Sequence, residues 1–154
     1  MKISLCMIAK NEAPTIQKAL KSVLPIVDEY VIGVDNSSTD DTMDEVRKFF
    51  AKNEIPNKVY SFQWENDFSK ARNEGSEKAS NDLIMYLDGH EYLKSGINKI
   101  KEIKKNGHGF EIFAVTLLCK LNGRLTSYPQ IRIARKNHKY SNKSHNVIPG
   151  MRHY

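Results

Sequence analysis

Short apolar runs alternate with amphipathic stretches along the first two thirds of the chain. Four of these runs, each bounded by polar or turn-forming residues, have the length and composition of buried β-strands: 3–8, 30–34, 58–62 and 83–87. Between the runs, apolar residues recur at helical spacing. The first predicted helix has its cap at Asn11 and Pro14 in its first turn, and it ends at Pro25. A second helix is predicted after a Ser38–Asp41 capping box, and a third from a cap at Asp67 to Ala79. A fourth is predicted from Gly96 to Lys105, with Ile97, Ile100 and Ile103 buried.

After Gly107 the pattern changes from helical to strand-like. Segments 110–121 and 124–134 flank Asn122-Gly123, a dipeptide that favours the tight primed turn of a β-hairpin. The earlier alternation of strands and helices implies parallel strands joined by crossover helices. The sequence therefore predicts one α/β domain over residues 1–154. Its sheet is expected to be doubly wound and mostly parallel, with antiparallel strands added at the C-terminal end.

Polar clusters directly follow the four predicted strands, at 10–12, 35–38, 64–67 and 88–91. In doubly wound sheets, ligands bind beyond the carboxyl ends of the parallel strands. Because those ends share one edge of the sheet, the four clusters should converge on a single rim. We therefore expect the binding site to lie on this rim.

Composition narrows the ligand class without identifying it. Hydrophobic residues make up 40% of the chain and charged residues 27%, which is an ordinary globular balance. The 24 Lys and Arg outnumber the 18 Asp and Glu, which gives a net charge of +6. A basic excess suits an anionic ligand such as a nucleotide diphosphate, and it suits nucleic acid equally well.

Two features concern the cellular setting. Cys6 and Cys119 lie inside apolar stretches, which indicates buried thiols rather than a disulfide or a metal pair. The first apolar run is too short for a signal peptide, and no segment reaches transmembrane length. We therefore expect a cytoplasmic protein without a membrane span.

Asp88-Gly89-His90 is the segment whose side chains are best suited to bind a metal ion. It offers a carboxylate and an imidazole two residues apart, and Gly89 permits a close approach of the backbone to a ligand. Such a pair is compatible with manganese, magnesium or zinc, and manganese suits it best where phosphate is also bound. His145 is a possible third ligand. The alternative is a turn in which Asp88 caps a backbone N–H and His90 is solvated.

Two further residues also have two interpretations each. Arg72 is either a charge on a helix surface or a phosphate contact near a helix N-terminus. Trp64, the sole tryptophan, either packs in the core or stacks on a base or sugar ring. The lysines between 94 and 105 are interpreted as the solvated face of an amphipathic helix.

Five segments, taken in order, resemble family 2 glycosyltransferases with the GT-A fold. Ser4–Glu12 is similar to the family's first strand and loop, and Val34–Thr42 to its Val-Asp-Asp-Gly-Ser-Thr-Asp-Asp-Thr stretch. Asp67–Asn73 resembles the Asp-Phe-Ala-x-Ala-Arg-Asn segment of one branch. Leu87–Glu91 stands where that branch has Leu-Asp-Ala-Asp-Glu, and Tyr140–Val147 is similar to a later Tyr-x-Gly-x-Val-His-Glu segment. Together these segments cover nearly the whole chain.

The resemblance implies a role for each matching residue. The nucleotide-sugar, commonly a uridine diphosphate sugar, would be bound by Ala9, Lys10, Asn11, Glu12, Asp35, Asp67, Lys70, Arg72, Asn73 and Asp88. Mn²⁺ or Mg²⁺ would be bound by Asp88, His90 and His145. The Asp-x-His variant is similar to that of enzymes that attach N-acetylgalactosamine to polypeptides, where His is a metal ligand. The reaction implied is displacement at the anomeric carbon with inversion of its stereochemistry.

The chain departs from the family pattern in two places. Asn146 replaces the Glu that usually follows the late His, and an amide cannot accept a proton, so Glu91 or a residue not identified from the sequence would have to be the general base. The chain is also shorter than usual members on the acceptor side. It is therefore expected to be short or truncated there, or to borrow contacts from another chain, which includes a homo-oligomer.

These departures leave three functions open. The first is a metal-dependent glycosyltransferase acting on an unidentified acceptor, which could be a protein, a glycan or a nucleic acid. The second is an inactive nucleotide-binding relative or partner module. The third is a glycosyltransferase that modifies nucleic acid, which the net charge of +6 would suit.

Overall fold

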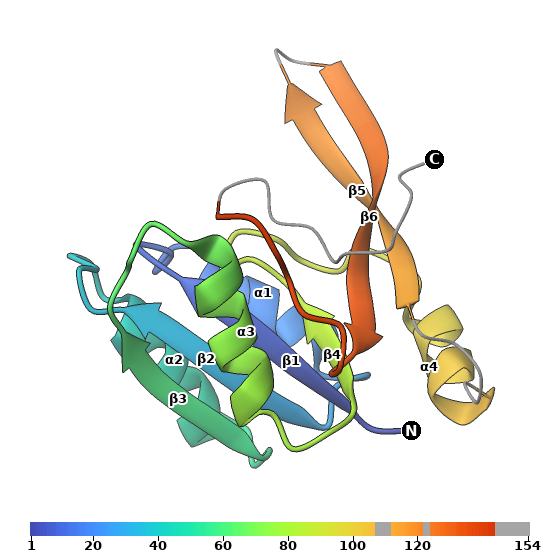
Figure 1. Ribbon diagram of the computed structural model, residues 1–154, viewed down its shortest axis with the longest axis horizontal. Coiled ribbons are helices and arrows are strands. Elements are labelled where there is room, and N and C mark those ends of the chain that lie inside the picture. Colours follow the sequence, from blue (N-terminus) through green and yellow to red (C-terminus); the bar gives the residue numbers. More distant parts are fainter. Residues whose placement is uncertain (107–111, 122–123, 144–154) are drawn as a thin grey trace.

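The protein is described here from a computed structural model, which defines residues 1–106, 112–121 and 124–143. Among these residues, six strands form one sheet in the order β3-β2-β1-β4-β6-β5 (Figure 1). The elements in chain order are β1 (Ile3–Ala9), α1 (Ile16–Val23), β2 (Glu29–Asp35), α2 (Thr42–Lys52), β3 (Asn57–Phe62), α3 (Phe68–Lys78), β4 (Leu83–Tyr86), α4 (Ile97–Asn106), β5 (Ile112–Leu121) and β6 (Arg124–Arg135).

Sheet topology confirms the predicted α/β class. Strands β1 to β4 are parallel, β6 pairs antiparallel with β4, and β5 pairs antiparallel with β6. Beyond its contact with β4, the β5–β6 hairpin projects away from the sheet (Figure 1). The two residues of its predicted turn, 122–123, lie outside the described residues.

Both faces of the sheet are covered, which explains why β1, β2 and β4 are almost continuously apolar. On one face, α1 and α2 pack their buried residues against alternate positions of β1, β2 and β4, and Ile100 of α4 joins this core. On the other face, α3 lies over β1 and β2, where Cys6 is a buried free thiol beside Tyr86. The side chain of Cys119 lies outside the described residues.

The predicted helix starts were right for α3 and wrong for α1 and α2. Asp67 caps α3, because its side chain accepts a hydrogen bond of 2.9 Å from the Lys70 N–H. Asn11 has a φ of 54°, which is left-handed and unsuited to an N-cap, and α1 begins only at Ile16. The Ser38–Asp41 capping box does not form, and Asp41 makes no side-chain cap bond.

Hydrogen bonds between two loops explain these errors. The Asn11 carboxamide oxygen accepts from the Thr39 N–H at 2.8 Å, and Asp40 accepts from the Ala13 N–H at 3.0 Å. Asn11 and Ser38 are therefore engaged between the loops after β1 and β2 instead of capping the helices that follow them. This cross-linking fixes the loop that carries Lys10 and Glu12.

Helix α4 is less buried than its pattern predicted. Ile100 is buried, but Ile97 and Ile103 are only partly covered.

None of the helices in the described part of the chain is long and apolar enough to cross a membrane.

Candidate functional site at the carboxyl ends of β1 and β4

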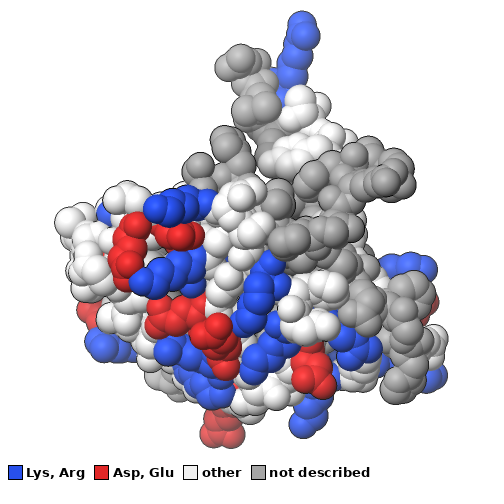
Figure 2. Space-filling view, in the orientation of Figure 1, with Lys and Arg blue, Asp and Glu red and all other residues white. Residues whose placement is uncertain are grey.

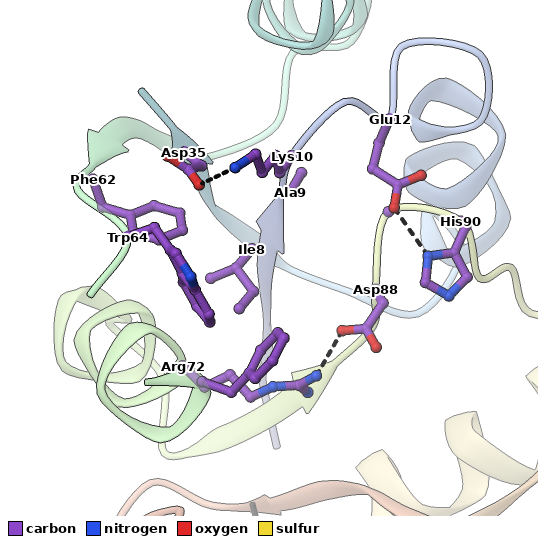
Figure 3. Close-up of a pocket in the computed structure, with 12 residues that line it drawn as sticks. Ile8, Ala9, Lys10, Glu12, Asp35, Phe62, Trp64, Arg72, Asp88 and His90 are labelled. Atoms are coloured by element: carbon purple, nitrogen blue, oxygen red, sulfur yellow. Dashed lines mark hydrogen bonds and ion pairs between the residues drawn. The ribbon is translucent and has the colours of Figure 1, made fainter. Parts of the chain in front are cut away.

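The strand order reverses between β1 and β4, because the chain builds outward to β3 and then returns to the other side of β1. A cavity of about 410 Å³ opens at the carboxyl ends of these strands (Figure 3). Topological switch points of this kind are the usual ligand sites of open α/β sheets. The residues that line the cavity are Ile8, Ala9, Lys10, Glu12, Asp35, Phe62, Trp64, Phe68, Arg72, Asp88, Gly89 and His90.

Asp35, the last residue of β2, is a buried carboxylate at one end of the cavity. Its Oδ1 accepts hydrogen bonds of 2.9 Å from both the N–H and the hydroxyl of Ser37, and Lys10 Nζ lies 3.5 Å from Oδ2. Burial alone would raise the pKa of Asp35, but these hydrogen bonds and the Lys10 charge hold it below its ordinary value. Asp35 is therefore an ionised acceptor that can bind donor groups of a ligand.

Aromatic side chains form the adjacent wall. Trp64 and Phe68 meet edge to face with ring centroids 4.6 Å apart, and the indole N–H donates to Asn66 at 3.1 Å. Phe68 is 41% exposed although it is apolar. A planar ring can stack on such a wall at little desolvation cost.

Asp88 follows β4 and lies between two arginines. Arg72 of α3 donates to Oδ1 at 2.8 Å, and an Arg132 nitrogen from β6 lies 3.8 Å from Oδ2. The Nε atoms of both arginines are buried without a hydrogen-bond partner among the described residues. Of the two, Arg72 lines the cavity, so its guanidinium can meet an anion that enters beside Asp88.

Glu91 closes the turn that carries Asp88. The Glu91 N–H donates to the Asp88 carbonyl at 2.9 Å, and the Asp88 N–H donates to Glu91 Oε2 at 3.0 Å. The other carboxylate oxygen, Oε1, forms an ion pair with Arg132. Both oxygens of the predicted general base are therefore engaged within the protein.

His90 stands at the mouth of the cavity and is 63% exposed. Its Nδ1 lies 3.0 Å from Glu12 Oε1, and this hydrogen bond raises the pKa of His90 above its ordinary value. A ligand atom from each of Asp88, His90 and Glu91 lies within 4.8 Å of the others. Two carboxylates and an imidazole suit manganese, magnesium or zinc, so this set of side chains fits a divalent cation.

Seven residues from the predicted nucleotide and metal sites meet at this cavity. They are Ala9, Lys10, Glu12, Asp35, Arg72, Asp88 and His90. Sequence positions up to 81 residues apart thus converge as expected from the strand ends.

The other predicted site residues are placed elsewhere. Asn11 bonds to Thr39, and Asp67 caps α3. Lys70 pairs with Glu65 at 2.6 Å on an exposed surface. The Asn73 side chain makes two hydrogen bonds of 2.9 Å to the backbone of Tyr140. His145 lies outside the described residues.

Arg132 is the site residue that sequence reasoning missed. It is 3% exposed and lies between apolar neighbours in β6. A charged residue inside an apolar strand is a signal for a buried ion pair, because an isolated buried charge is too costly. Its partners, however, are more than 40 positions earlier in the chain and could not be named.

A sequence profile of the family described as "Glycosyl transferase family 2" matches residues 4–153. This chain belongs to glycosyl transferase family 2. One relative is the SPbeta prophage-derived glycosyltransferase SunS of Bacillus subtilis (strain 168), which is 34% identical over 114 residues. That match covers 73% of this chain and 26% of SunS, so the chain spans about a quarter of the relative's length.

Solved structures show the same fold at low identity. The S. aureus TarS 1–349 structure in complex with UDP matches with a TM-score of 0.59 and 21% identity, over 92% of this chain and 50% of that one. The glucosyl-3-phosphoglycerate synthase of Mycobacterium tuberculosis in complex with Mn²⁺, UDP and phosphoglyceric acid matches with a TM-score of 0.54 and 20% identity, over 72% and 41%. The family 2 chain described here therefore has the GT-A fold.

Proposed function

We propose that this chain transfers a sugar from a nucleotide-diphosphate sugar, bound in the cavity between β1 and β4, with a divalent cation held by Asp88 and His90. The observation that carries the proposal is the meeting of both side chains, with Arg72, at the switch point of the sheet. Relatives support it, since the TarS structure contains UDP and the M. tuberculosis synthase contains Mn²⁺ and UDP. A uridine nucleotide and Mn²⁺ are therefore the first ligands to test.

Each part of the cavity suits one part of such a donor. The ionised Asp35 suits hydroxyl or N–H donors of a nucleoside, and the Trp64–Phe68 wall suits the face of its base. Arg72 suits the diphosphate, because it lines the cavity beside Asp88 and a guanidinium binds phosphate oxygens through charge-assisted hydrogen bonds. A bound cation would neutralise the charge that develops on the departing diphosphate.

We propose that the acceptor approaches from a second cavity of about 310 Å³ that shares His90 with the donor cavity. Glu91 and Arg132 lie on its polar side, and Leu118 of β5 belongs to its apolar wall. Attack from this side, opposite the diphosphate, would invert the anomeric carbon. Leu118→Trp should then leave nucleotide binding unchanged and lower transfer to any acceptor found by screening. Unchanged transfer would place the acceptor elsewhere.

Glu91 remains the proposed general base, but one observation favours a second candidate function. Its carboxylate is already engaged by Arg132 and by the Asp88 N–H. A carboxylate held in this way is a poor proton acceptor, which favours a nucleotide-binding protein without turnover. Release of the nucleotide diphosphate from a panel of nucleotide-sugars, with and without Mn²⁺, separates the two. Binding of nucleotide-sugars without any Mn²⁺-dependent release of the nucleotide diphosphate would refute the proposed metal-dependent transfer.

Surface charge gives little support to a nucleic-acid acceptor. The face in Figure 2 intersperses Lys and Arg with Asp and Glu instead of forming one basic patch. On α3 the lysines pair with acidic neighbours, as in Lys70–Glu65 and Lys78–Glu74. Such pairs reduce the local field that would attract a phosphate backbone.

A further inference from the structure

Glu12 was expected to contact the nucleotide, but its carboxylate is committed to protein groups. Oε1 lies 3.0 Å from His90 Nδ1, and Oε2 accepts a hydrogen bond of 2.9 Å from the Thr15 hydroxyl. The side chain is 22% exposed, whereas that of His90 is 63% exposed. The better anchored partner in this pair is therefore Glu12.

The backbone of Glu12 is fixed on both sides. Its N–H donates to the Thr42 hydroxyl at 2.7 Å, and its carbonyl accepts from the N–H groups of Thr15 and Ile16 at 3.0 and 2.9 Å. The loop after β1 is thus tied to the start of α2 and to the start of α1. Glu12 is held by these contacts without any help from His90.

Gly89 lets the Glu12 side chain reach the histidine. A Cβ at position 89 would lie 2.8 Å from Glu12 Cγ and 2.9 Å from Glu12 Cβ, closer than real side chains approach. Glycine is thus needed at this position because Glu12 packs against its backbone. Gly89 was predicted to let a ligand approach the backbone closely, and in the structure the group that lies there is the Glu12 side chain.

The contact determines which ring nitrogen is available. A carboxylate oxygen accepts hydrogen bonds, so Nδ1 carries the proton that faces Glu12. Figure 3 shows Nδ1 directed at Glu12 and Nε2 turned away from it. In metal sites, a carboxylate on one imidazole nitrogen typically fixes the tautomer and directs the other nitrogen to the cation.

We propose that Glu12 is a positioning residue for His90, holding Nδ1 so that Nε2 binds the cation together with Asp88. The inference rests on the proposed function, because it assumes that His90 and Asp88 bind a metal ion. It assigns to Glu12 a role outside nucleotide contact.

The test is Mn²⁺ binding without nucleotide, measured by calorimetry at a pH where the imidazole is neutral. Glu12→Ala should weaken binding by about ten- to a hundred-fold, the usual effect of removing a partner of a metal-bound histidine. Glu45→Ala is the matched control, since Glu45 is 24% exposed and its carboxylate is engaged by Gln17 and Lys48 away from the site. It should bind Mn²⁺ as the wild type does.

A double-mutant cycle separates positioning from a general structural effect. If Glu12 acts through His90, the Glu12→Ala/His90→Ala variant binds Mn²⁺ no more weakly than His90→Ala alone. Pulsed EPR of the bound Mn²⁺ should detect a coupled ¹⁴N nucleus in the wild type and lose most of that signal in Glu12→Ala. Additive losses, or an unchanged ¹⁴N signal, would overturn the inference.

Glu12→Gln keeps the size of the side chain and covers the case in which the alanine variant does not fold. Its neutral amide holds Nδ1 less firmly, so its loss of affinity should be smaller than that of Glu12→Ala and again absent on the His90→Ala background. Wild-type affinity that depends on Asp88 but not on Glu12 would refute this inference alone. Absence of any Mn²⁺ binding by the wild type would refute the metal-dependent function as well.

Discussion

Arg132 and Glu91 form a largely buried ion pair, and its removal should show how firmly the turn that carries Asp88 is held. The Arg132 side chain is 4% exposed and that of Glu91 is 16% exposed, so neither charge is well hydrated. Replacing one partner of a buried pair leaves the other charge uncompensated, which costs about 3–5 kcal/mol. Because Glu91 keeps some contact with solvent, Arg132→Met should lower the free energy of unfolding by about 3 kcal/mol, near the lower end of that range.

The double variant Glu91→Leu/Arg132→Met provides the decisive comparison. It removes both charges and leaves apolar groups of similar size, so it should be clearly more stable than the sum of the two single variants predicts. Urea unfolding followed by circular dichroism gives the four free energies, with the exposed Arg124→Met as the control for the change of residue type. A loss below about 1 kcal/mol for Arg132→Met would fall in the range of exposed pairs and refute the reasoning, as would additive single effects.

Three further predictions concern the ends of the elements and the site. Asp67→Ala should destabilise the protein by about 1 kcal/mol in thermal or urea unfolding, because it removes the α3 cap. Asp41→Ala is the control and should have little effect, because Asp41 makes no cap bond. Equal effects of the two variants would contradict this prediction. Gly89→Ala should weaken Mn²⁺ binding about tenfold, since its Cβ would meet Glu12 at 2.8 Å, and calorimetry showing wild-type affinity would contradict this. The Glu12 hydrogen bond raises the pKa of His90, so protons compete with the cation up to a higher pH. Titrations at several pH values should therefore show that Mn²⁺ affinity falls as the pH falls through that raised pKa. In Glu12→Ala the same fall in affinity should occur at a lower pH.

Much of the fold could be predicted because buried strands and amphipathic helices leave periodic patterns. The four parallel strands appear as apolar runs, and one residue at or just past the end of each, Lys10, Asp35, Trp64 and Asp88, lines the same cavity as expected. Asp67 was predictable as a cap, since its partner is three residues away in the chain. These features depend on local chemistry that a single segment contains.

The errors arose where distant segments compete for the same groups. Asn11 and Ser38 are good capping residues in isolation, but the loops that carry them bond to each other. The position of Arg132 beside Glu91 depends on how the β5–β6 hairpin returns to β4. Glu12 reaches His90 across 78 positions, so no local pattern could reveal that pair.

In the proposed function, Asp88 binds a cation that in turn helps to hold a nucleotide diphosphate. The most direct measurement is calorimetric titration of UDP and UDP-sugars into the wild type and Asp88→Asn, each with and without Mn²⁺. Mn²⁺ should strengthen nucleotide binding by the wild type and should have no such effect on Asp88→Asn, whose fold is checked by its unfolding transition. Nucleotide binding that does not respond to Mn²⁺, or that responds equally in the two proteins, would contradict it.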